Sequence, residues 1–331
     1  MGSEVPALGI SHLHRFWAQQ TAKARSEPQT EQDKDWVADN TLLAGLRVGL
    51  RETYDYLLNN PPDFAEFEQW LLARNGGSLD APRIERLNVA LSDAGRSGQP
   101  ANPDAEPALS TADLEFWDQN GYVILHDAVP PENCQAAANA ICEFLEVRLD
   151  RPDTWYGGPQ GHSIWIPLLH HPALWANRDS PRIHRAFARL WNREDVWVNV
   201  DQAGFNPPEK PGWKFPGPHL HWDVSLVPPI PFGVQAILYL ADVAPDQGAF
   251  TCVPGFHRKI DAWLAGLPEG ADPRAQPLPD AAVPIAGRAG DLVIWNHALP
   301  HGSSPNRAAL PRIVQYLVCR PSRWGYNPVW R

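Results

Sequence analysis

The sequence predicts a mainly β fold, a jelly roll of the cupin-like kind with helices packed on it, preceded by an N-terminal helical extension. Apolar residues recur at helical spacing through residues 10–75, whereas short runs rich in Val, Ile, Leu and aromatic residues dominate after residue 195. The 35 prolines also require many ordered loops, because proline is excluded from helix interiors and central strands. Helices followed by many short strands are typical of a β-sandwich or jelly roll with packed helices.

The first part of the chain, residues 1–91, is predicted to be the helical extension. HLHRFWAQQTAKAR and TLLAGLRVGLRETYDYLL place apolar residues three to four positions apart, and FAEFEQWLLARNGG ends in a glycine pair that can stop a helix. The following stretch is rich in Ser, Gly, Pro and Asp, which predicts a linker or mobile loop over residues 92–108. Residues 109–331 then form the predicted β domain.

The β domain opens with a helix and a strand. In STADLEFWDQNGY, Ser110 or Thr111 can cap a helix that Gly121 ends, and YVILHDAV predicts the strand. PPENCQAAANAICEFLEVRL predicts a second helix with proline at its start. Further strands are expected in DVWVNVDQAGF, VQAILYLADV, GAFTCVPG, GDLVIWNHAL and RIVQYLVCRP.

Composition argues against several classes of partner. A formal net charge of -10 disfavours nucleic acid, because phosphate binding requires a basic face. The four cysteines form no CxxC pair and are expected as free thiols in a reducing compartment. No signal peptide is recognised at the N-terminus, and no run of about 18 apolar residues could span a membrane. A cytoplasmic protein without a membrane partner is therefore expected.

The sequence HLHWD, residues 219–223, indicates a metal site. On an extended strand His221 and Asp223 point to the same face, so an imidazole and a carboxylate converge. His301, which follows the strand of GDLVIWNHAL, is the candidate third ligand. Two histidines and one carboxylate form a facial triad with three open positions, which suits Fe(II) that binds a chelating cosubstrate and O₂ together.

An arginine lies eleven residues after His301, the candidate third ligand. Arg312 opens the strand RIVQYLV, and a strand beside the one that ends at His301 could direct its guanidinium to the metal pocket. The planar fork of arginine matches a carboxylate with two hydrogen bonds. A keto acid at the metal with a distal carboxylate at the arginine fits 2-oxoglutarate.

These motifs together resemble the phytanoyl-CoA dioxygenase family of Fe(II)- and 2-oxoglutarate-dependent oxygenases. The resemblance covers roughly residues 110–320 and includes LEFWDQNGYVILHDAVPPENC, HWD, ADVAPDQGAFTCVPGFH and HGSSPNRAALPR. It implies a double-stranded β-helix, a variant of the jelly roll. It also implies that His221, Asp223 and His301 bind the metal, and that Arg312 with Ser303 holds the cosubstrate carboxylate.

Other site residues are predicted with less support from the motifs. Asn199 and Gln235 occupy inward strand positions and are candidate cosubstrate contacts. Trp155 and Trp165, from a glycine-containing loop region over residues 151–180, could pack on a substrate, and His219 is a candidate substrate contact or structural residue. Asp223 itself favours hydroxylation over halogenation, since halogenating relatives replace this carboxylate with a small residue.

The sequence therefore predicts an iron- and 2-oxoglutarate-dependent dioxygenase that hydroxylates an unactivated C–H bond of a small organic molecule and releases succinate and CO₂. Two alternatives stay open: a cupin-like metalloenzyme that does not use 2-oxoglutarate, and a non-catalytic binding protein of the same fold. The N-terminal residues could cover the barrel, form a homodimer contact or add to the substrate pocket. The identity of the substrate does not follow from the sequence.

Overall fold

The computed structural model describes residues 8–27, 35–92, 107–157 and 164–331. The chain divides into two compact units. The first unit comprises Met1–Pro103, Asn192–Val200 and Cys319–Trp324, and the second comprises Asp104–Trp191, Asp201–Val318 and Gly325–Arg331. The predicted linker over 92–108 lies almost entirely outside the described residues and stays a prediction.

The first unit is built mainly of helices. They are α1 (Ser11–Ala24), α2 (Trp36–Gly45), α3 (Leu50–Asn59), α4 (Phe64–Arg74) and α5 (Ala81–Leu91). Aspartates begin three of them, because the side chains of Asp35, Asp63 and Asp80 each accept a hydrogen bond from a backbone amide in the first turn. The apolar faces of these helices enclose a core that includes Phe16, Leu42, Leu57, Phe67 and Leu71.

Two short strands from later in the chain belong to this helical unit. β3 (Val196–Val198) pairs antiparallel with β11 (Cys319–Pro321). Trp197 of β3 is buried in the helical core, and the guanidinium of Arg86 lies 4.1 Å from its ring centroid. The helical unit is therefore completed by strands that the sequence pattern assigns to the β domain.

Helix α6 (Thr111–Asn120) begins and ends, and helix α7 (Pro131–Phe144) begins, as their sequences predict. Ser110 caps α6 through the amide of Asp113, and Gly121 ends it with a φ of 75°. α7 has its proline at the first helical position. The remaining helices are α8 (Pro172–Arg178), α9 (Pro181–Trp191) and α10 (Ile260–Ala265), with 3₁₀ turns η3 (Pro152–Tyr156), η4 (Phe256–Arg258) and η5 (Pro273–Ala275).

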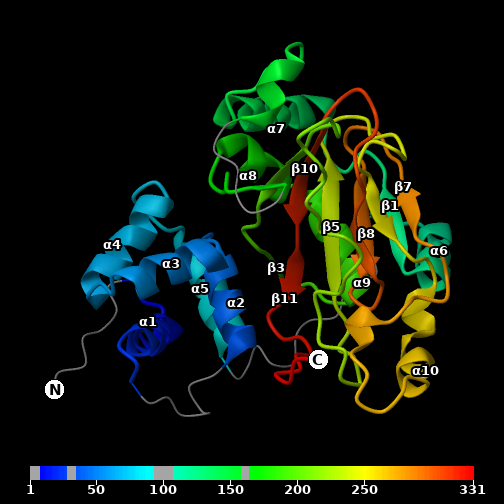
Figure 1. Cartoon of the computed structure of the whole chain (residues 1–331). Helices are drawn as coiled ribbons and strands as arrows, with labels where there is room; N and C mark the ends of the chain where they lie inside the picture. Colours follow the sequence, from blue (N-terminus) through cyan, green and yellow to red (C-terminus); the bar gives the residue numbers. More distant parts are fainter. Residues whose placement is uncertain (1–7, 28–34, 93–106, 158–163) are drawn as a thin grey trace. The chain divides into compact units, whose positions relative to one another are not determined.

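Two antiparallel sheets form the centre of the second unit. The larger has the strand order β1 (Tyr122–Leu125), β8 (Leu292–Asn296), β5 (Val234–Tyr239), β10 (Arg312–Leu317), β4 (Ala203–Asn206) and β2 (Trp165–Ile166), and Figure 1 shows β10, β5, β8 and β1 side by side. The smaller has the order β7 (Val283–Ile285), β6 (Phe250–Cys252) and β9 (His301–Ser303). The predicted jelly-roll class, a double-stranded β-helix with packed helices, is confirmed.

The core between the two sheets follows the alternation of the strands. Ile237 and Tyr239 of β5 and Val314 of β10 join Phe250 and Cys252 of β6 in one buried cluster. The opposite face of the larger sheet packs on helices, as the hydrogen bond from Asn177 of α8 to Gln315 of β10 shows. All four cysteines are free thiols. Within the described ranges, no helix is both long and apolar enough to cross a membrane.

Candidate metal centre

Three side chains of the second unit converge on one point. The ligand atoms of His221, Asp223 and His301 all lie within 4.8 Å of one another. Nε2 of His221 lies 3.3 Å from Oδ1 of Asp223, and Nε2 of His301 lies 3.3 Å from Oδ2 of the same carboxylate. The structure thus brings together two imidazoles and one carboxylate, the donor set of the facial triad that leaves further coordination positions open.

The backbone places the two histidines opposite each other. His221 and His301 form an isolated antiparallel bridge, and His301 is also the first residue of β9. Gly302 makes the close approach of the two segments feasible, because a Cβ on this residue would lie 2.5 Å from the carbonyl oxygen of His219. The geometry of the pair is therefore set before any metal binds.

Hydrogen bonds orient both imidazole rings. Nδ1 of His221 lies 2.7 Å from the carbonyl oxygen of His219, and Nδ1 of His301 lies 3.0 Å from that of Leu299. A carbonyl oxygen only accepts, so each Nδ1 carries a proton, and Nε2 is the ring atom that faces Asp223 and could bind a metal. His219 therefore supports the site through its backbone, while its exposed ring packs edge-on against Phe215.

The carboxylate of Asp223 is held in its ionised form. Nε2 of Gln235, on β5, donates to Oδ2 of Asp223 at 2.9 Å. Burial alone would raise the pKa of Asp223, but hydrogen bonds with His221 and His301 outweigh it and hold the pKa far below its usual value. Burial alone would lower the pKa of His221, yet its contact with Asp223 raises it. The negative charge of Asp223 thus faces both histidines.

Aromatic side chains cover one side of His301. The ring centroid of Trp295 lies 5.0 Å from that of His301, and the ring of Phe250 is stacked on it at 6.2 Å. His301 is 4% exposed. These rings restrict the movement of the imidazole and keep water from that side of the ligand.

Arg312 reaches the same region from β10. It is fully buried, and its Nη1 donates to the carbonyl oxygen of Gly248 at 2.8 Å and to Oγ of Ser303 at 2.9 Å. Ser303 is two residues after His301 on β9, so both side chains lie on the same face of that strand. Among the described residues, Nε and Nη2 of Arg312 have no partner.

The residues present fit both groups that the sequence predicts. The Nε2 atoms of both histidines and the ionised Asp223 suit Fe(II), which accepts imidazole and carboxylate ligands. The unpaired Nε and Nη2 of Arg312 are two donors of one planar fork, which a carboxylate can satisfy with both of its oxygens. A buried guanidinium with unpaired donors indicates an anionic ligand, since burial without a partner is costly.

The other predicted residues differ in where the structure places them. Gln235 contacts Asp223 directly. Asn199 follows β3 in the first unit, so its role as a cosubstrate contact stays a prediction. Trp165 lies on β2 with its ring edge-on to Tyr316 at 6.3 Å. Trp155 is 3% exposed and donates to the carbonyl oxygen of Arg148, which leaves little of its ring for a substrate.

Sequence reasoning missed Tyr316 of β10. Its hydroxyl is buried without a partner among the described residues. Tyr316 pairs with Ile237 across the strands, so it is the diagonal neighbour of Gln235 on the same face of the sheet. Gln235 also has a buried Oε1 without a partner. The two polar atoms come together only through the register of β5 and β10, and no local sequence motif indicates this.

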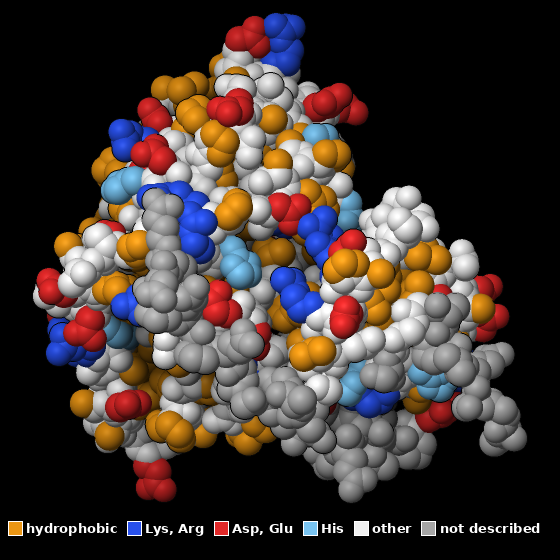
Figure 2. All heavy atoms as spheres, turned by 180° about the vertical axis from the view of Figure 1, so that it is seen from behind, with side chains coloured by type: hydrophobic (Ala, Val, Ile, Leu, Met, Phe, Trp, Pro, Cys, Tyr) orange, Lys and Arg blue, Asp and Glu red, His pale blue; other side chains and the backbone are white. Residues whose placement is uncertain are grey.

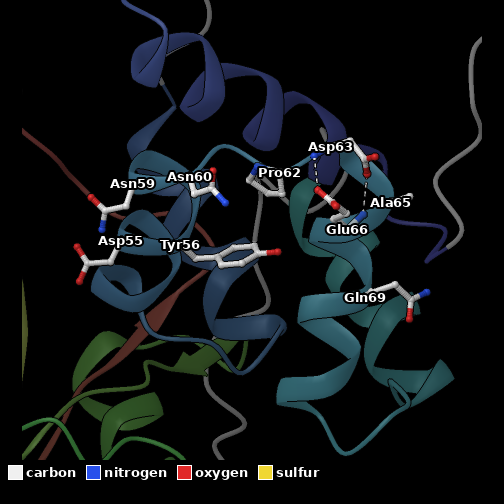
Figure 3. Close-up of a pocket in the computed structure, with 9 residues that line it drawn as sticks. All are labelled: Asp55, Tyr56, Asn59, Asn60, Pro62, Asp63, Ala65, Glu66 and Gln69. Carbon is white, nitrogen blue, oxygen red and sulfur yellow. Dashed lines mark hydrogen bonds between the residues drawn. The ribbon is translucent and has the colours of Figure 1, made fainter.

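A hollow of about 690 Å³ lies on the first unit between α3 and α4, as Figure 3 shows. Its acidic residues include Asp55, Asp63 and Glu66. Asp63 and Glu66 already accept hydrogen bonds from each other's backbone amides at the start of α4. The hollow contains no residue of the triad and is not assigned a function.

Charged side chains of both signs lie on the surface of the molecule. Figure 2 shows acidic and basic side chains interspersed over the face in view, without a broad basic area. Such an area is what a nucleic-acid backbone requires. The face in view therefore offers no support for nucleic-acid binding.

Residues 117–314 match the family described as Phytanoyl-CoA dioxygenase (PhyH). The chain belongs to the phytanoyl-CoA dioxygenase family. The matched range contains the triad together with Ser303 and Arg312. The resemblance drawn from the HWD and HGSSPNR motifs is confirmed, and with it the class of Fe(II)- and 2-oxoglutarate-dependent oxygenases.

Similarity to individual proteins of this family is distant. A Dictyostelium discoideum protein named as a candidate phytanoyl-CoA dioxygenase is 23% identical over 261 residues, which cover 63% of this chain and 74% of the relative. An ectoine dioxygenase of Bordetella bronchiseptica is 22% identical over 253 residues, covering 67% and 80%. The crystal structure of EctD from S. alaskensis with bound Fe matches with a TM-score of 0.48 and 18% identity, covering 69% of this chain and 84% of that one.

Proposed function

We propose that this phytanoyl-CoA dioxygenase family member binds Fe(II) through His221, Asp223 and His301, and 2-oxoglutarate through Arg312 with Ser303. It uses them with O₂ to hydroxylate an unactivated C–H bond of a small organic molecule, releasing succinate and CO₂. The observation that carries the proposal is the buried guanidinium of Arg312, whose Nε and Nη2 have no partner among the described residues. A metalloenzyme without 2-oxoglutarate has no use for such a group.

Each residue of the site has a separate task in this reaction. The imidazoles, fixed at Nδ1, present Nε2 to the metal, and Asp223 contributes the negative charge. Arg312 binds and orients the distal carboxylate of the cosubstrate, while Ser303 holds the guanidinium in place. Bound Fe(II) and 2-oxoglutarate together supply the activation of O₂ and the oxidative decarboxylation. Trp295 and Phe250 exclude water beside His301.

Hydroxylation is favoured over halogenation by the carboxylate at position 223. With a metal bound, Asp223 would occupy a position that a halide would otherwise take, and Gln235 donates to its Oδ2 beside both histidines. The relative named ectoine dioxygenase is by its name an oxygenase of a small organic molecule, which supports that class of substrate. Two polar atoms, the hydroxyl of Tyr316 and Oε1 of Gln235, are available to hydrogen-bond such a molecule.

Anaerobic titration of the protein with Fe(II) and then with 2-oxoglutarate tests the proposal. A weak visible charge-transfer band is expected when the keto acid chelates the metal. His301→Ala should abolish metal binding, whereas Arg312→Met should retain the metal and lose the band at moderate cosubstrate concentration. Candidate substrates would then be tested one at a time, and a substrate is identified by the succinate that is released in its presence.

Two results would overturn the assignment. Iron binding without the band would remove 2-oxoglutarate and favour a metalloenzyme of another class. Absence of metal binding by the wild-type protein would favour a non-catalytic role for the fold.

A further inference from the structure

Arg274, in η5, contacts the backbone on both sides of the metal-binding carboxylate. Its Nη1 donates to the carbonyl oxygen of Trp222 at 2.7 Å, and its Nη2 donates to that of Val224 at 2.7 Å. These residues immediately precede and follow Asp223. One rigid, planar group therefore bonds the carbonyl oxygens of the residues before and after the ligand and limits the movement of both.

A second segment reinforces this contact. Residues 325–331 lie along the loop that follows Asp223: Oγ of Ser225 donates to the carbonyl oxygen of Val329, and the amide of Leu226 donates to that of Arg331. The same carbonyl oxygen of Arg331 accepts from Nη2 of Arg274 at 3.2 Å. The guanidinium also lies 4.9 Å from the ring centroid of Trp330. Trp330 and Arg331 thus contact the same guanidinium that bonds Trp222 and Val224.

We propose that Arg274 is a positioning residue for the metal centre, and that residues 325–331 keep its guanidinium in place. It acts through the backbone of residues 222–224, which sets the direction of the Asp223 side chain relative to His221 and His301. This inference rests on the proposed function, because it assumes that the triad binds a metal. Partners that orient metal ligands typically change metal affinity about 10- to 100-fold when they are removed.

The geometry separates this role from ordinary loop stabilisation. The guanidinium makes no hydrogen bond with a ligand side chain, and its two shortest bonds both end on carbonyl oxygens of the residues next to Asp223. No sequence motif marks this role, because Arg274 lies in the proline-rich loop ADPRAQPLPD, 51 residues after Asp223. Arg274 and the residues beside Asp223 come into contact only in the folded chain.

Titration of the apoprotein with Co(II), followed by its visible d–d absorbance, tests the inference without turnover. Arg274→Met is expected to weaken Co(II) binding about tenfold or more and to change the band shape. Arg274→Lys keeps the charge but loses the fork, so it should recover only part of the affinity. Full recovery with lysine would assign the effect to charge and would overturn the proposal.

Arg178 provides a matched control in the same unit. It is buried, donates to the carbonyl oxygens of Leu169 and Asp201, and lies 4.8 Å from the ring centroid of Trp175. Arg178→Met should lower the unfolding temperature of the apoprotein and leave Co(II) affinity unchanged in the folded fraction. Equal losses of affinity in the two methionine variants would show that Arg274 only stabilises the fold.

A milder variant keeps the test valid if Arg274→Met does not fold. Trp330 is 63% exposed, so Trp330→Ala should fold and weaken Co(II) binding about two- to fivefold by loosening the guanidinium. Wild-type protein that binds Co(II) as tightly as both variants would overturn this inference alone. Wild-type protein that binds no Co(II) would overturn the proposed function along with it.

Discussion

His221 and His301 bond each other reciprocally through their backbones: the amide of each donates to the carbonyl oxygen of the other, at 2.9 and 3.0 Å. Their ring centroids lie 4.7 Å apart. One pair of peptide groups thus fixes the separation of two proposed metal ligands that come from distant parts of the chain. A site held in this way does not need the metal to assemble it, so metal affinity is sensitive to small changes in the backbone nearby.

Gly302→Ala is expected to damage the site and the fold together. Its Cβ would lie 2.5 Å from the carbonyl oxygen and 2.7 Å from the carbonyl carbon of His219, which are backbone atoms that cannot simply rotate away. A cost of about 1–3 kcal/mol in the free energy of unfolding is expected, with weaker Co(II) binding. Gly157→Ala is the control, because a Cβ there meets nothing within 4 Å. Urea unfolding and Co(II) titration of both variants check the prediction, and equal behaviour would contradict it.

Arg312 and Ser303 should affect cosubstrate affinity to different degrees. Arg312→Lys loses the planar fork that presents Nε and Nη2, so 2-oxoglutarate should bind on the order of 100-fold more weakly. Ser303→Ala removes one hydrogen bond to Nη1, and a loss of roughly 3- to 10-fold is expected. Calorimetric titration of the Co(II)-loaded protein measures both. A larger effect from the serine than from the arginine would disprove the assigned roles.

Removal of the hydroxyl group should affect the stability of the fold differently at two tyrosines on neighbouring strands. The hydroxyl of Tyr239 donates to the carbonyl oxygen of Ile285 and accepts from the amide of Phe250, so Tyr239→Phe should cost roughly 2 kcal/mol or more. The hydroxyl of Tyr316 is buried without a partner among the described residues, so Tyr316→Phe should leave stability unchanged or raise it slightly. Urea unfolding of both variants distinguishes them. Similar losses would mean that the Tyr316 hydroxyl stabilises the fold rather than serving a ligand.

Asp39 in α2 predicts a pH dependence for the helical unit. Burial raises its pKa to about 6, although Arg15 beside it acts in the opposite direction. The folded state therefore binds this proton more tightly than the unfolded chain. The resulting stabilisation is complete below about pH 3.8 and is lost as the pH rises through about 6, by roughly 3 kcal/mol in total.

Comparison of wild type with Asp39→Asn at acidic and neutral pH isolates this group. The asparagine cannot ionise, so the variant should gain stability relative to wild type as the pH rises from 4 to 8. Urea unfolding followed by helical ellipticity measures the difference at each pH. A constant difference across this range would show that Asp39 is not responsible.

The parts of this protein that local pattern determines were predictable. His221 and Asp223 do converge, although the expected strand is wrong: His221 forms only an isolated bridge and Asp223 lies in a bend. The expectation that Arg312 opens a strand beside the one that ends at His301 is also wrong, because β10 pairs with β5 and β4, and β8 pairs with β1 and β5. Proline at the start of α7 and Gly121 at the end of α6 mark helix boundaries by backbone geometry alone. These helix boundaries depend on a few adjacent residues, so they can be predicted from the sequence alone.

The parts that depend on strand register and loop packing were not predictable. Gln235 was placed on an inward strand position, but its contact with Asp223 follows from where β5 lies relative to that loop. β3 and β11 read as strands of the β domain, yet their pairing places them in the helical unit. Trp155 lies in a region expected to cover a substrate, and tertiary packing buries it instead.

The lone positive charge of Arg312 also has a consequence for the lifetime of the protein. Its guanidinium is fully buried in a central strand of the larger sheet, and its Nε and Nη2 have no partner among the described residues. An anion that binds there has no equivalent partner in the unfolded chain, and its binding energy is added to the stability of the fold. Resistance to proteolysis should therefore rise with the concentration of the cosubstrate. The concentration of 2-oxoglutarate would then also determine how long the protein survives proteolysis.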